Sequence, residues 1–488
     1  MRIETIETAW LGNRSYVAFA ETDADGPVAV AVDPPRDIDR VQSLVAAAEA
    51  RLVLVLETHW HADYVSGGLH LARAHGAGYG VPPADPAPGF AARRVIDGDE
   101  FSVGELTLRA VHTPGHTADH MSYVASVAGV PVAVFTGGCL LHGAVGRTDL
   151  ADASITRALT ELQWASARRL ATRLPMDTQV LPTHGFGSLC SAAPAARGGE
   201  STIGKEQRVN SALTQPRQKF VDSLLVGLDA FPAYYRRTPA VNVAGPAPID
   251  LSLPRRIEPT ELAARIEAGE WVVDLRQRRV FADGHLPGTL NFDAGGNVGV
   301  YLPWLLTPGA ALTLLAEHED DIARVRRQLA LVGIDEIAGC ATGRPPEWTC
   351  TGGETASYPV LSFNQLSAQV KERRPTILDV RNRGEVVDGY IDGSMHIPLP
   401  ELIQRLPELP SPSREELWVH CQTGFRAAIA ASMLEQAGYG VVLIDEPFAL
   451  AREAGLPIVA GHSQTGAWVP GSSGMRTPTS RAVSSATL

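Results

Sequence analysis

Short apolar runs alternate with amphipathic segments through the first 250 residues of the chain, which is the pattern of a layered α/β domain. The spacing of apolar positions predicts helices over residues 37–50 and 68–75. Apolar runs predict buried strands at residues 28–32, 52–56, 106–111, 130–135 and 179–181. These runs end in polar residues, and α/β enzymes build their sites from side chains at strand ends.

An internal repeat follows this region. The segment Trp-Val-Val-Asp-Leu-Arg at 271–276 matches Thr-Ile-Leu-Asp-Val-Arg at 376–381. The same offset of 105 residues separates Gly284 from Gly389 and Gly333 from Gly438. A match without gaps over so long a stretch predicts two copies of one small α/β fold.

Changes in composition divide the chain. Residues 231–256 are rich in Pro with little periodicity and predict a linker, as do residues 343–358. The Ser/Gly/Thr-rich end predicts disorder. We therefore expect one domain at 1–250, a second at 256–345, a third at 358–461 and a disordered tail at 462–488.

Charge and composition restrict the partners. Lys and Arg number 42 against 54 Asp and Glu, a net charge of −12, which argues against nucleic acid as the main partner. No apolar run approaches the ~18 residues of a membrane span, and the amino-terminal residues carry no export signal. With only five Cys in 488 residues, we expect a cytoplasmic protein without a disulfide framework. We also expect that the protein does not bind membranes and that it forms a homo-oligomer.

One cysteine lies in a setting that favours reactivity. Residues 417–420 predict a strand that leads into Cys421, and a helix follows at 427–437. Backbone N–H groups of a tight loop that opens a helix stabilise anions, so they lower a thiol pKa. Gly424 lets the loop turn inward and Arg426 adds positive charge. Cys421 is therefore a candidate nucleophile.

Three histidine elements predict a metal site in the first domain. The segment Thr58-His59-Trp-His61-Ala-Asp63 follows a predicted strand, and His116 and His184 each come after another apolar run. Imidazole and carboxylate ligands suit Zn or Fe. We expect these side chains to converge on one ion.

The cysteine loop and its surroundings resemble the rhodanese family of sulfurtransferases. The resemblance rests on Asp379-Val-Arg381, the Gly389 segment and Cys421-x-x-Gly424-x-Arg426. It implies that Cys421 carries a sulfane sulfur as a persulfide, with Arg426 beside it, held by the loop residues Gln422, Thr423, Gly424 and Phe425. In the first repeat copy Ala316 stands at the position of Cys421, so that copy resembles a rhodanese without rhodanese chemistry.

The histidine elements resemble the metallo-β-lactamase superfamily, in its glyoxalase II and persulfide dioxygenase branch. Gly146-Arg147-Thr-Asp149 and the segment at 201–210 favour the dioxygenase side. The resemblance implies an αββα sandwich followed by two rhodanese-like α/β domains. It also implies mononuclear Fe(II), with Zn as the alternative, held by His59 and His116. The expected substrates are a low-molecular-weight persulfide, such as glutathione persulfide, and O₂, with sulfite or thiosulfate as products. Arg147 is interpreted either as an ion-pair partner of Asp149 or as a contact for a substrate carboxylate.

Two positions depart from the family pattern. Tyr64 stands where the superfamily has a His, which argues against a dinuclear hydrolase, and Gly138 stands where the dioxygenases have the Asp ligand of iron. Asp63, His61, His184, Cys139 or water remain candidates for the third ligand. Two alternative hypotheses follow: a sulfurtransferase whose first domain is an impaired enzyme or a scaffold, and a metal-dependent thioester hydrolase of the glyoxalase II kind.

Overall fold

The structure is a computed structural model of the 488-residue chain. It describes residues 1–22, 26–185, 187–192, 199–349, 354–412 and 416–460. The expected disordered tail at 462–488 lies outside the described residues. Among the helices described, none combines the length and hydropathy that a membrane span requires.

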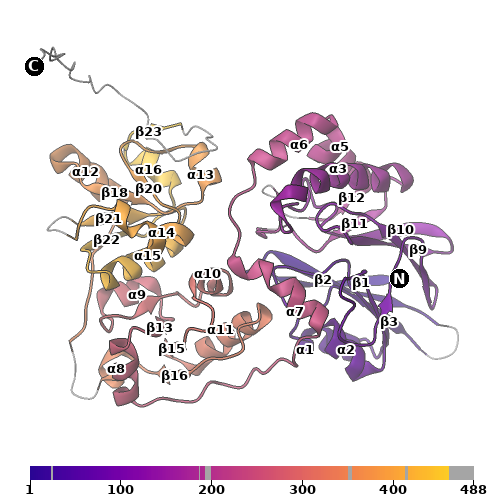
Figure 1. The fold of residues 1–488 in the computed structure, drawn as a ribbon, viewed down its shortest axis with the longest axis horizontal. Coiled ribbons are helices and arrows are strands. Elements are labelled where there is room, and N and C mark those ends of the chain that lie inside the picture. The colour runs from indigo at the N-terminus through magenta and orange to yellow at the C-terminus, as the bar shows by residue number, and fades with distance from the viewer. Residues whose placement is uncertain (23–25, 186, 193–198, 350–353, 413–415, 461–488) are drawn as a thin grey trace, which may run out of the picture.

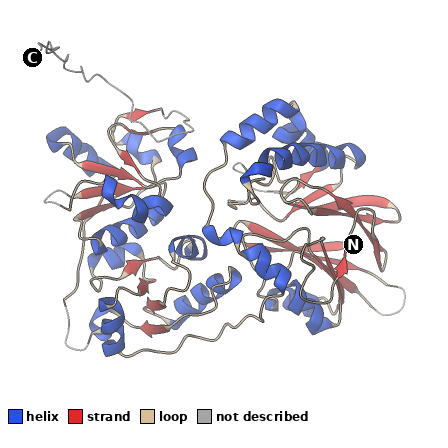
Figure 2. Ribbon diagram, in the orientation of Figure 1, coloured by secondary structure: helices blue, strands red, loops and turns tan. Residues whose placement is uncertain are grey.

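The first domain contains two six-stranded sheets that face each other (Figures 1 and 2). The first sheet has the order β1 (Arg2–Thr8), β2 (Asn13–Ala20), β3 (Val28–Val32), β4 (Arg51–Leu56), β5 (Gly78–Val81) and β6 (Arg93–Arg94). The second has the order β12 (Ser201–Thr202), β11 (Gln179–Pro182), β10 (Val130–Gly137), β9 (Met121–Val127), β8 (Leu106–His112) and β7 (Glu100–Val103). Apolar side chains from both sheets, such as Tyr16, Val30 and Phe135, form one buried core between them.

Helices cover the outer face of each sheet. On the first sheet α1 (Asp39–Ala47) and α2 (Gly68–His75) bury Val41, Val45 and Leu69 against the strands. The second sheet is covered by α3 (Thr156–Arg173), α4 (Ile203–Val209), α5 (Ser211–Thr214) and α6 (Arg217–Val226). The layers are therefore helix, sheet, sheet and helix, and the predicted αββα sandwich is confirmed. The predicted strand at 28–32 and the predicted helix at 68–75 have the expected bounds.

Two smaller α/β units follow, one above the other on the left of Figure 1. The first has the sheet order β14 (Leu290–Asn291), β13 (Trp271–Asp274), β15 (Leu312–Ala316) and β16 (Gly339–Thr342), with α8 (Pro259–Glu267), α9 (Arg278–Asp283), α10 (Val298–Leu305) and α11 (Glu319–Leu331). The second has the order β17 (Val360–Leu361), β22 (Val441–Ile444), β21 (Leu417–His420), β18 (Thr376–Asp379) and β20 (Met395–His396), and β19 (Tyr390–Ile391) pairs with β23 (Ile458–Val459). Its helices are α12 (Phe363–Arg373), α13 (Arg383–Val387), α14 (Leu402–Arg405), α15 (Phe425–Gln436) and α16 (Ala449–Glu453).

The repeat found in the sequence is a repeat of structure. Strands β13 and β15 pair in parallel with Asp274 opposite Leu315, and β18 and β21 pair with Asp379 opposite His420, an offset of 105 residues in both strands. In each copy the Arg two residues after this Asp donates hydrogen bonds back to its carboxylate. Both units therefore share one core topology, and Ala316 ends β15 just as Cys421 follows β21.

The segment at 231–256, expected to be an irregular linker, is partly helical. It forms a 3₁₀ turn at Ala233–Arg236 and the helix α7 (Thr238–Ala244), which packs on the first domain through Asn242 before the chain runs extended to α8 (Figure 1). Apolar periodicity could not reveal this helix, because the side chains that it buries include the polar Thr238 and Asn242.

The middle unit is docked on the first domain through a buried arginine. Arg36, which is 3% exposed, donates to the Ala330 and Ala247 carbonyls at 2.7 and 3.0 Å and to both carboxylate oxygens of Asp335 at 2.7 and 3.0 Å. One guanidinium thus joins three segments of the chain.

Arg36→Ala should loosen this docking. The Ala330 carbonyl is the buried acceptor of Arg36, and leaving it without a partner costs about 1–3 kcal/mol. Limited proteolysis between residues 245 and 258 should therefore accelerate, and the midpoint of chemical unfolding should fall. Arg157→Ala removes a solvent-exposed pair with Asp222 and should change stability by less than about 1 kcal/mol. Equal effects of both substitutions would contradict this account of the interface.

Candidate functional site: a histidine centre and a cysteine loop

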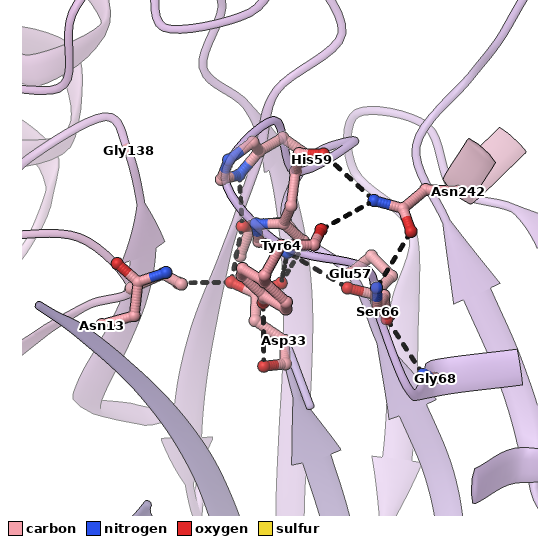
Figure 3. Close-up of polar contacts among 12 residues, drawn as sticks. Asn13, Asp33, Glu57, His59, Tyr64, Ser66, Gly68, Gly138 and Asn242 are labelled. Carbon is pink, nitrogen blue, oxygen red and sulfur yellow. Dashed lines mark hydrogen bonds and ion pairs between the residues drawn. The ribbon is translucent and has the colours of Figure 1, made fainter. Parts of the chain in front are cut away.

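The loop after β4 carries the first histidines and is held by polar side chains from distant parts of the chain (Figure 3). Asp33, at the end of β3, accepts hydrogen bonds from the Thr58 N–H at 2.6 Å and the Thr58 hydroxyl at 2.7 Å. Asn242 of α7 donates to the carbonyls of His61 and Tyr64 at 3.0 and 3.1 Å and accepts from the Ser66 N–H at 2.9 Å. The backbone of the histidine loop is thereby fixed from two sides.

Three imidazoles converge in the space enclosed by this loop. His59, His116 and His184 are each at most 1% exposed, and ligand atoms of the three lie within 4.8 Å of one another. His59 Nε2 and His184 Nε2 are 3.0 Å apart. His116 Nε2 is buried and has no hydrogen-bond partner among the described residues. Buried nitrogens gathered in this way are typical of a site for a metal ion.

The second nitrogen of each ring is bound to the protein. His59 Nδ1 lies 2.9 Å from the Thr58 hydroxyl, and His116 Nδ1 lies 2.7 Å from the Arg147 carbonyl. His184 Nδ1 lies 3.2 Å from Asn13 Oδ1 and 3.4 Å from a carboxylate oxygen of Asp63. Burial and then the neighbouring imidazoles lower the pKa of His59 and of His116 well below the usual value, so both rings are neutral. Fixed, neutral rings are the state in which histidine binds metal.

His61 has a different environment. Its Nε2 lies 3.1 Å from Asp33 and 3.2 Å from Glu57, both of which are buried carboxylates. Burial acts to lower the pKa of His61, but attraction to Asp33 and hydrogen bonds to both carboxylates outweigh it and raise the pKa to about 10. His61 therefore belongs to an internal charge network behind the loop.

The two positions that depart from the family pattern both make close contacts inside the protein. Tyr64 is buried and its hydroxyl donates to the Asp33 carbonyl at 3.1 Å. Gly138 follows β10, and a Cβ built on it would lie 2.2 Å from His116 Cδ2. The ring of His116 thus occupies the space next to Gly138 in which a larger side chain would begin.

Arg147 forms an ion pair inside the protein, one of the two roles considered for it. Its guanidinium binds both carboxylate oxygens of Asp149 at 2.7 and 2.8 Å and donates to the Leu189 and Asp229 carbonyls at 2.9 and 2.6 Å. Its backbone carbonyl is the partner of His116. Arg147 therefore anchors the segment whose carbonyl orients the His116 ring.

Cys421 lies in the loop between β21 and α15, as the sequence pattern predicts. Its Sγ is buried and accepts a hydrogen bond from the Gly424 N–H at 3.2 Å. Gly424 has φ +95°, and a Cβ there would clash with Asp445, so glycine is required. Arg426 binds both carboxylate oxygens of Glu385 at 2.6 and 2.7 Å. The arginine therefore stiffens the start of α15 and leaves the sulfur to the loop N–H groups.

The middle unit, which has Ala316 at the position of Cys421, forms one wall of a pocket beside the Cys421 loop. A cavity of about 620 Å³ is lined on one side by Gln422, Thr423, Phe425 and Arg426, and on the other by Gln277, Arg278, Asp293, Gly295, Gly296, Asn297 and Tyr301 of the middle unit. Arg278 bridges Asp293 at 3.0 Å and Asp445 at 2.5 Å, which fixes this wall to the last unit. The middle unit thus forms part of the wall of a pocket whose neighbouring cysteine, Cys421, belongs to the last unit.

A second cavity lies between the first and last domains. Its volume is about 620 Å³, and its walls include Arg147 and Ser188 on one side and Asn382 and Glu385 on the other. Arg147 contacts His116 through its carbonyl, and Glu385 holds Arg426. The cavity therefore touches the surroundings of both the histidine centre and the cysteine loop.

Sequence reasoning missed several residues that shape the centre. Asp33, Asn13 and Asn242 are far from the histidine motifs in sequence, and no local pattern marks them. His120 had a weak signal, four residues after His116; its Nε2 accepts from the Gly138 N–H at 2.9 Å, and burial lowers its pKa to about 3. Cys139, considered as a ligand, is a buried thiol whose pKa burial raises to about 12.

Comparisons with known proteins agree with this architecture. Residues 37–184 match the model of the metallo-beta-lactamase superfamily, and residues 362–449 match that of the rhodanese-like domain. The chain thus joins a metallo-β-lactamase-fold domain to a carboxy-terminal rhodanese-like domain. A metallo-beta-lactamase structure from Staphylococcus aureus subsp. aureus COL is similar in fold, with a TM-score of 0.61 and 23% identity, over 70% of this chain and 99% of that one.

Curated relatives are similar to part of the chain. An atrochrysone carboxyl ACP thioesterase of Aspergillus chevalieri is 30% identical over 188 residues, 37% of this chain and 54% of the relative. A hydroxyacylglutathione hydrolase-like protein of Homo sapiens is 32% identical over 174 residues, 35% of this chain and 56% of the relative. The chain spans about half the length of these relatives. Both domains are thus of enzyme type, and the metallo-β-lactamase fold together with the His/Asp cluster indicates a metal ion.

Gly138→Ala should weaken metal binding. The added methyl group would lie 2.2 Å from the His116 ring, so the ring must move away from the Arg147 carbonyl that orients it. Loss of such an orienting contact lowers metal affinity about 10–100-fold, which competition titration with a chromophoric chelator measures. Gly78→Ala is the control, because its Cβ would make only an ordinary 3.5 Å contact with Leu54. Unchanged affinity in Gly138→Ala would refute the packing argument.

Proposed function

We propose that this protein is a two-site enzyme of sulfur metabolism. The histidine centre oxidises a low-molecular-weight persulfide, and the Cys421 loop transfers sulfane sulfur. In the first reaction persulfide, O₂ and water give thiol and sulfite. In the second, sulfite takes the outer sulfur of the Cys421 persulfide to give thiosulfate and free Cys421, or the same step runs in reverse.

The observation that carries the proposal is that the histidine cluster forms one centre. The groups of side chains able to hold a metal overlap in His59, His61 or His184. Tyr64 occupies a position where a dinuclear member of the superfamily would place a further ligand, which favours a single ion. With Gly138 at the position of the dioxygenases' Asp, another group of the cluster would supply the third ligand. A single ion held by two imidazoles and a carboxylate is typical of iron that activates O₂, and the cluster offers Asp33 and Asp63 beside its imidazoles. Its fusion to a sulfur-carrying cysteine favours a persulfide as the substrate.

The chain's own residues would supply binding and orientation. His59 and His116 would hold the ion, together with a third group of the cluster, and Fe(II) when bound supplies the O₂ chemistry that side chains lack. The Arg147 carbonyl keeps the His116 ring in position. The cavity between the first and last domains is lined by Arg147, whose carbonyl contacts His116, and by Glu385, which pairs with Arg426, and it would give a small thiol room near both sites.

At the second site the loop prepares the cysteine. The Gly424 N–H bonded to Cys421 Sγ stabilises negative charge on sulfur. The cavity beside Gln422 and Thr423 opens the loop to a small sulfur donor or acceptor. Arg426 remains paired with Glu385, so loop N–H groups, with the helix behind them, would hold the persulfide.

A second candidate function is thioester hydrolysis with zinc. The names of the curated relatives, a thioesterase and a hydroxyacylglutathione hydrolase-like protein, favour it. Tyr64 and Gly138 count against it, because a dinuclear hydrolase needs ligands at both positions. In a third candidate the first domain is a scaffold for the sulfurtransferase.

Oxygen consumption distinguishes these candidates. The full-length chain, loaded anaerobically with Fe(II), is mixed with glutathione persulfide while O₂ uptake and sulfite release are followed. Stoichiometric O₂ loss with sulfite release supports the proposal. No uptake, with thiosulfate–cyanide sulfurtransfer retained, supports the scaffold. Cleavage of hydroxyacylglutathione by zinc-loaded protein supports the hydrolase.

Cys421→Ser should abolish sulfurtransfer and leave O₂ consumption unchanged, because the serine hydroxyl cannot carry a persulfide. Thiosulfate–cyanide turnover measures the first activity and an oxygen electrode the second. Cys340→Ser is a matched control, since this thiol of the middle unit donates to the Pro254 carbonyl and a hydroxyl preserves that bond. Equal loss of both activities in Cys421→Ser would refute the division of labour between the two sites.

A further inference from the structure

The pocket between the middle and last units borders most of the cysteine loop. Cys421 Sγ is buried, so a sulfur donor has to reach it through a space next to this loop. Four loop residues form part of the wall of that pocket: Gln422, Thr423, Phe425 and Arg426. A smaller cavity of about 340 Å³ borders the loop through Gln422 alone. The larger pocket, with a volume of about 620 Å³, is therefore where we expect a small sulfur donor.

The charged side chains of this pocket are already paired. Arg426 binds both carboxylate oxygens of Glu385 at 2.6 and 2.7 Å. Arg278 lies 3.0 Å from Asp293 and 2.5 Å from Asp445. The charge of a guanidinium held in this way is balanced, and fewer of its N–H groups remain for another anion. Recognition of a donor molecule therefore depends on the uncharged polar groups of the wall.

Two such groups come from the start of α10 in the middle unit. Asn297 is the N-cap residue of this helix, but its side chain forms no capping hydrogen bond. Tyr301 lies four residues further along, on the same side of the helix, and both side chains line the pocket. The Tyr301 hydroxyl forms no hydrogen bond with another described residue, and its electrostatic neighbours include Arg426 and Cys421. Burial raises the pKa of Tyr301, so the hydroxyl keeps its proton and can donate it to a ligand.

The position of α10 beside the cysteine loop is fixed by close packing. A Cβ on Gly296 would lie 2.2 Å from the Phe425 ring, so this approach requires glycine. The rings of Tyr301 and Phe425 are 5.9 Å apart. On the side of the first domain, Val300 packs in one apolar cluster with Tyr64. The two polar groups are therefore held in place before a ligand arrives.

We propose that Tyr301 and Asn297 of the middle unit bind the SO₃ group of the sulfur donor in the pocket beside the Cys421 loop. This group is common to thiosulfate and sulfite, and its charged oxygens accept hydrogen bonds from a hydroxyl and an amide. The inference rests on the sulfur transfer of the proposed function. It assigns the specificity of that reaction to the unit that has Ala316 in place of the cysteine.

The transfer step leaves the SO₃ group as a product in the pocket. The Cys421 thiolate attacks the outer sulfur of thiosulfate, and the S–S bond of thiosulfate breaks. Its electron pair leaves with sulfite, and Cys421 becomes a persulfide anion. The hydroxyl of Tyr301 and the amide of Asn297 would hold the SO₃ oxygens before and after this step.

Steady-state kinetics of thiosulfate–cyanide transfer tests the inference, because cyanide carries no SO₃ group. Tyr301→Phe keeps the ring and its packing but loses the hydroxyl. We expect its kcat/KM for thiosulfate to fall about 10–100-fold, the effect of losing a hydrogen bond to a charged group, while kcat/KM for cyanide stays within about twofold. Asn297 is exposed, so Asn297→Ala should fold normally and show the same separation of the two constants.

Tyr439→Phe is the matched control, because it also removes a tyrosine hydroxyl. Tyr439 follows the end of the 12-residue helix α15, about 18 Å from the start of that helix at the cysteine loop. This variant should match the wild type in both constants.

Unchanged kcat/KM for thiosulfate in Tyr301→Phe and Asn297→Ala would overturn the inference. An equal fall in both constants would overturn it as well, because it would indicate damage to the cysteine loop instead of lost recognition. Absence of sulfur transfer in the wild-type protein would refute the proposed reaction at Cys421 together with this inference. Wild-type transfer with unaltered kinetics in both variants would refute this inference alone.

Discussion

The buried carboxylate of Asp33 is the interaction on which the histidine centre depends. It lies at the end of β3 in a left-handed backbone conformation, φ 50°, and is fully buried. It accepts from the Thr58 N–H, the Thr58 hydroxyl and the Thr183 hydroxyl. Those two threonines immediately precede His59 and His184, so one carboxylate sets the relative position of two histidines from opposite sheets. A buried charge is tolerated only when it is fully hydrogen-bonded, and here that requirement holds the two sheets together at the histidine centre.

The middle unit shows how a domain can lose its chemistry and remain necessary. Ala316 at the end of β15 is fully buried, so this strand end is part of a core. The unit binds the first domain through Arg36 and Asp335 and the last domain through Arg278 and Asp445. It therefore connects the domains that carry the two candidate sites, and it supplies one wall of the pocket beside the Cys421 loop.

Much of the site was predictable from local sequence. The apolar runs gave the strands that precede His59, His184 and Cys421, because burial on both faces makes such strands continuous in hydrophobicity. Cys421 and Gly424 were recognisable because a thiol that follows a strand, with a glycine in the loop that opens the next helix, is typical of a reactive cysteine. Asn242 was not predictable, since its contacts with the histidine loop span more than 170 residues. The helix that carries it is only 7 residues long and lies in a segment that was interpreted as a linker.

The sequence by itself determined the order of domains, the repeat with its missing cysteine and the residue types of both centres, because these follow from periodicity and spacing. Only the tertiary structure decided which imidazoles face one another. Ring orientation depends on hydrogen bonds from Asp33, Asn13 and the Arg147 carbonyl, which lie far from the motifs in sequence. It also showed why Gly138 stands beside His116: the ring fills the space that a side chain would need. Sequence spacing indicates which side chains approach a point, whereas packing and proton positions decide which of them can bind there.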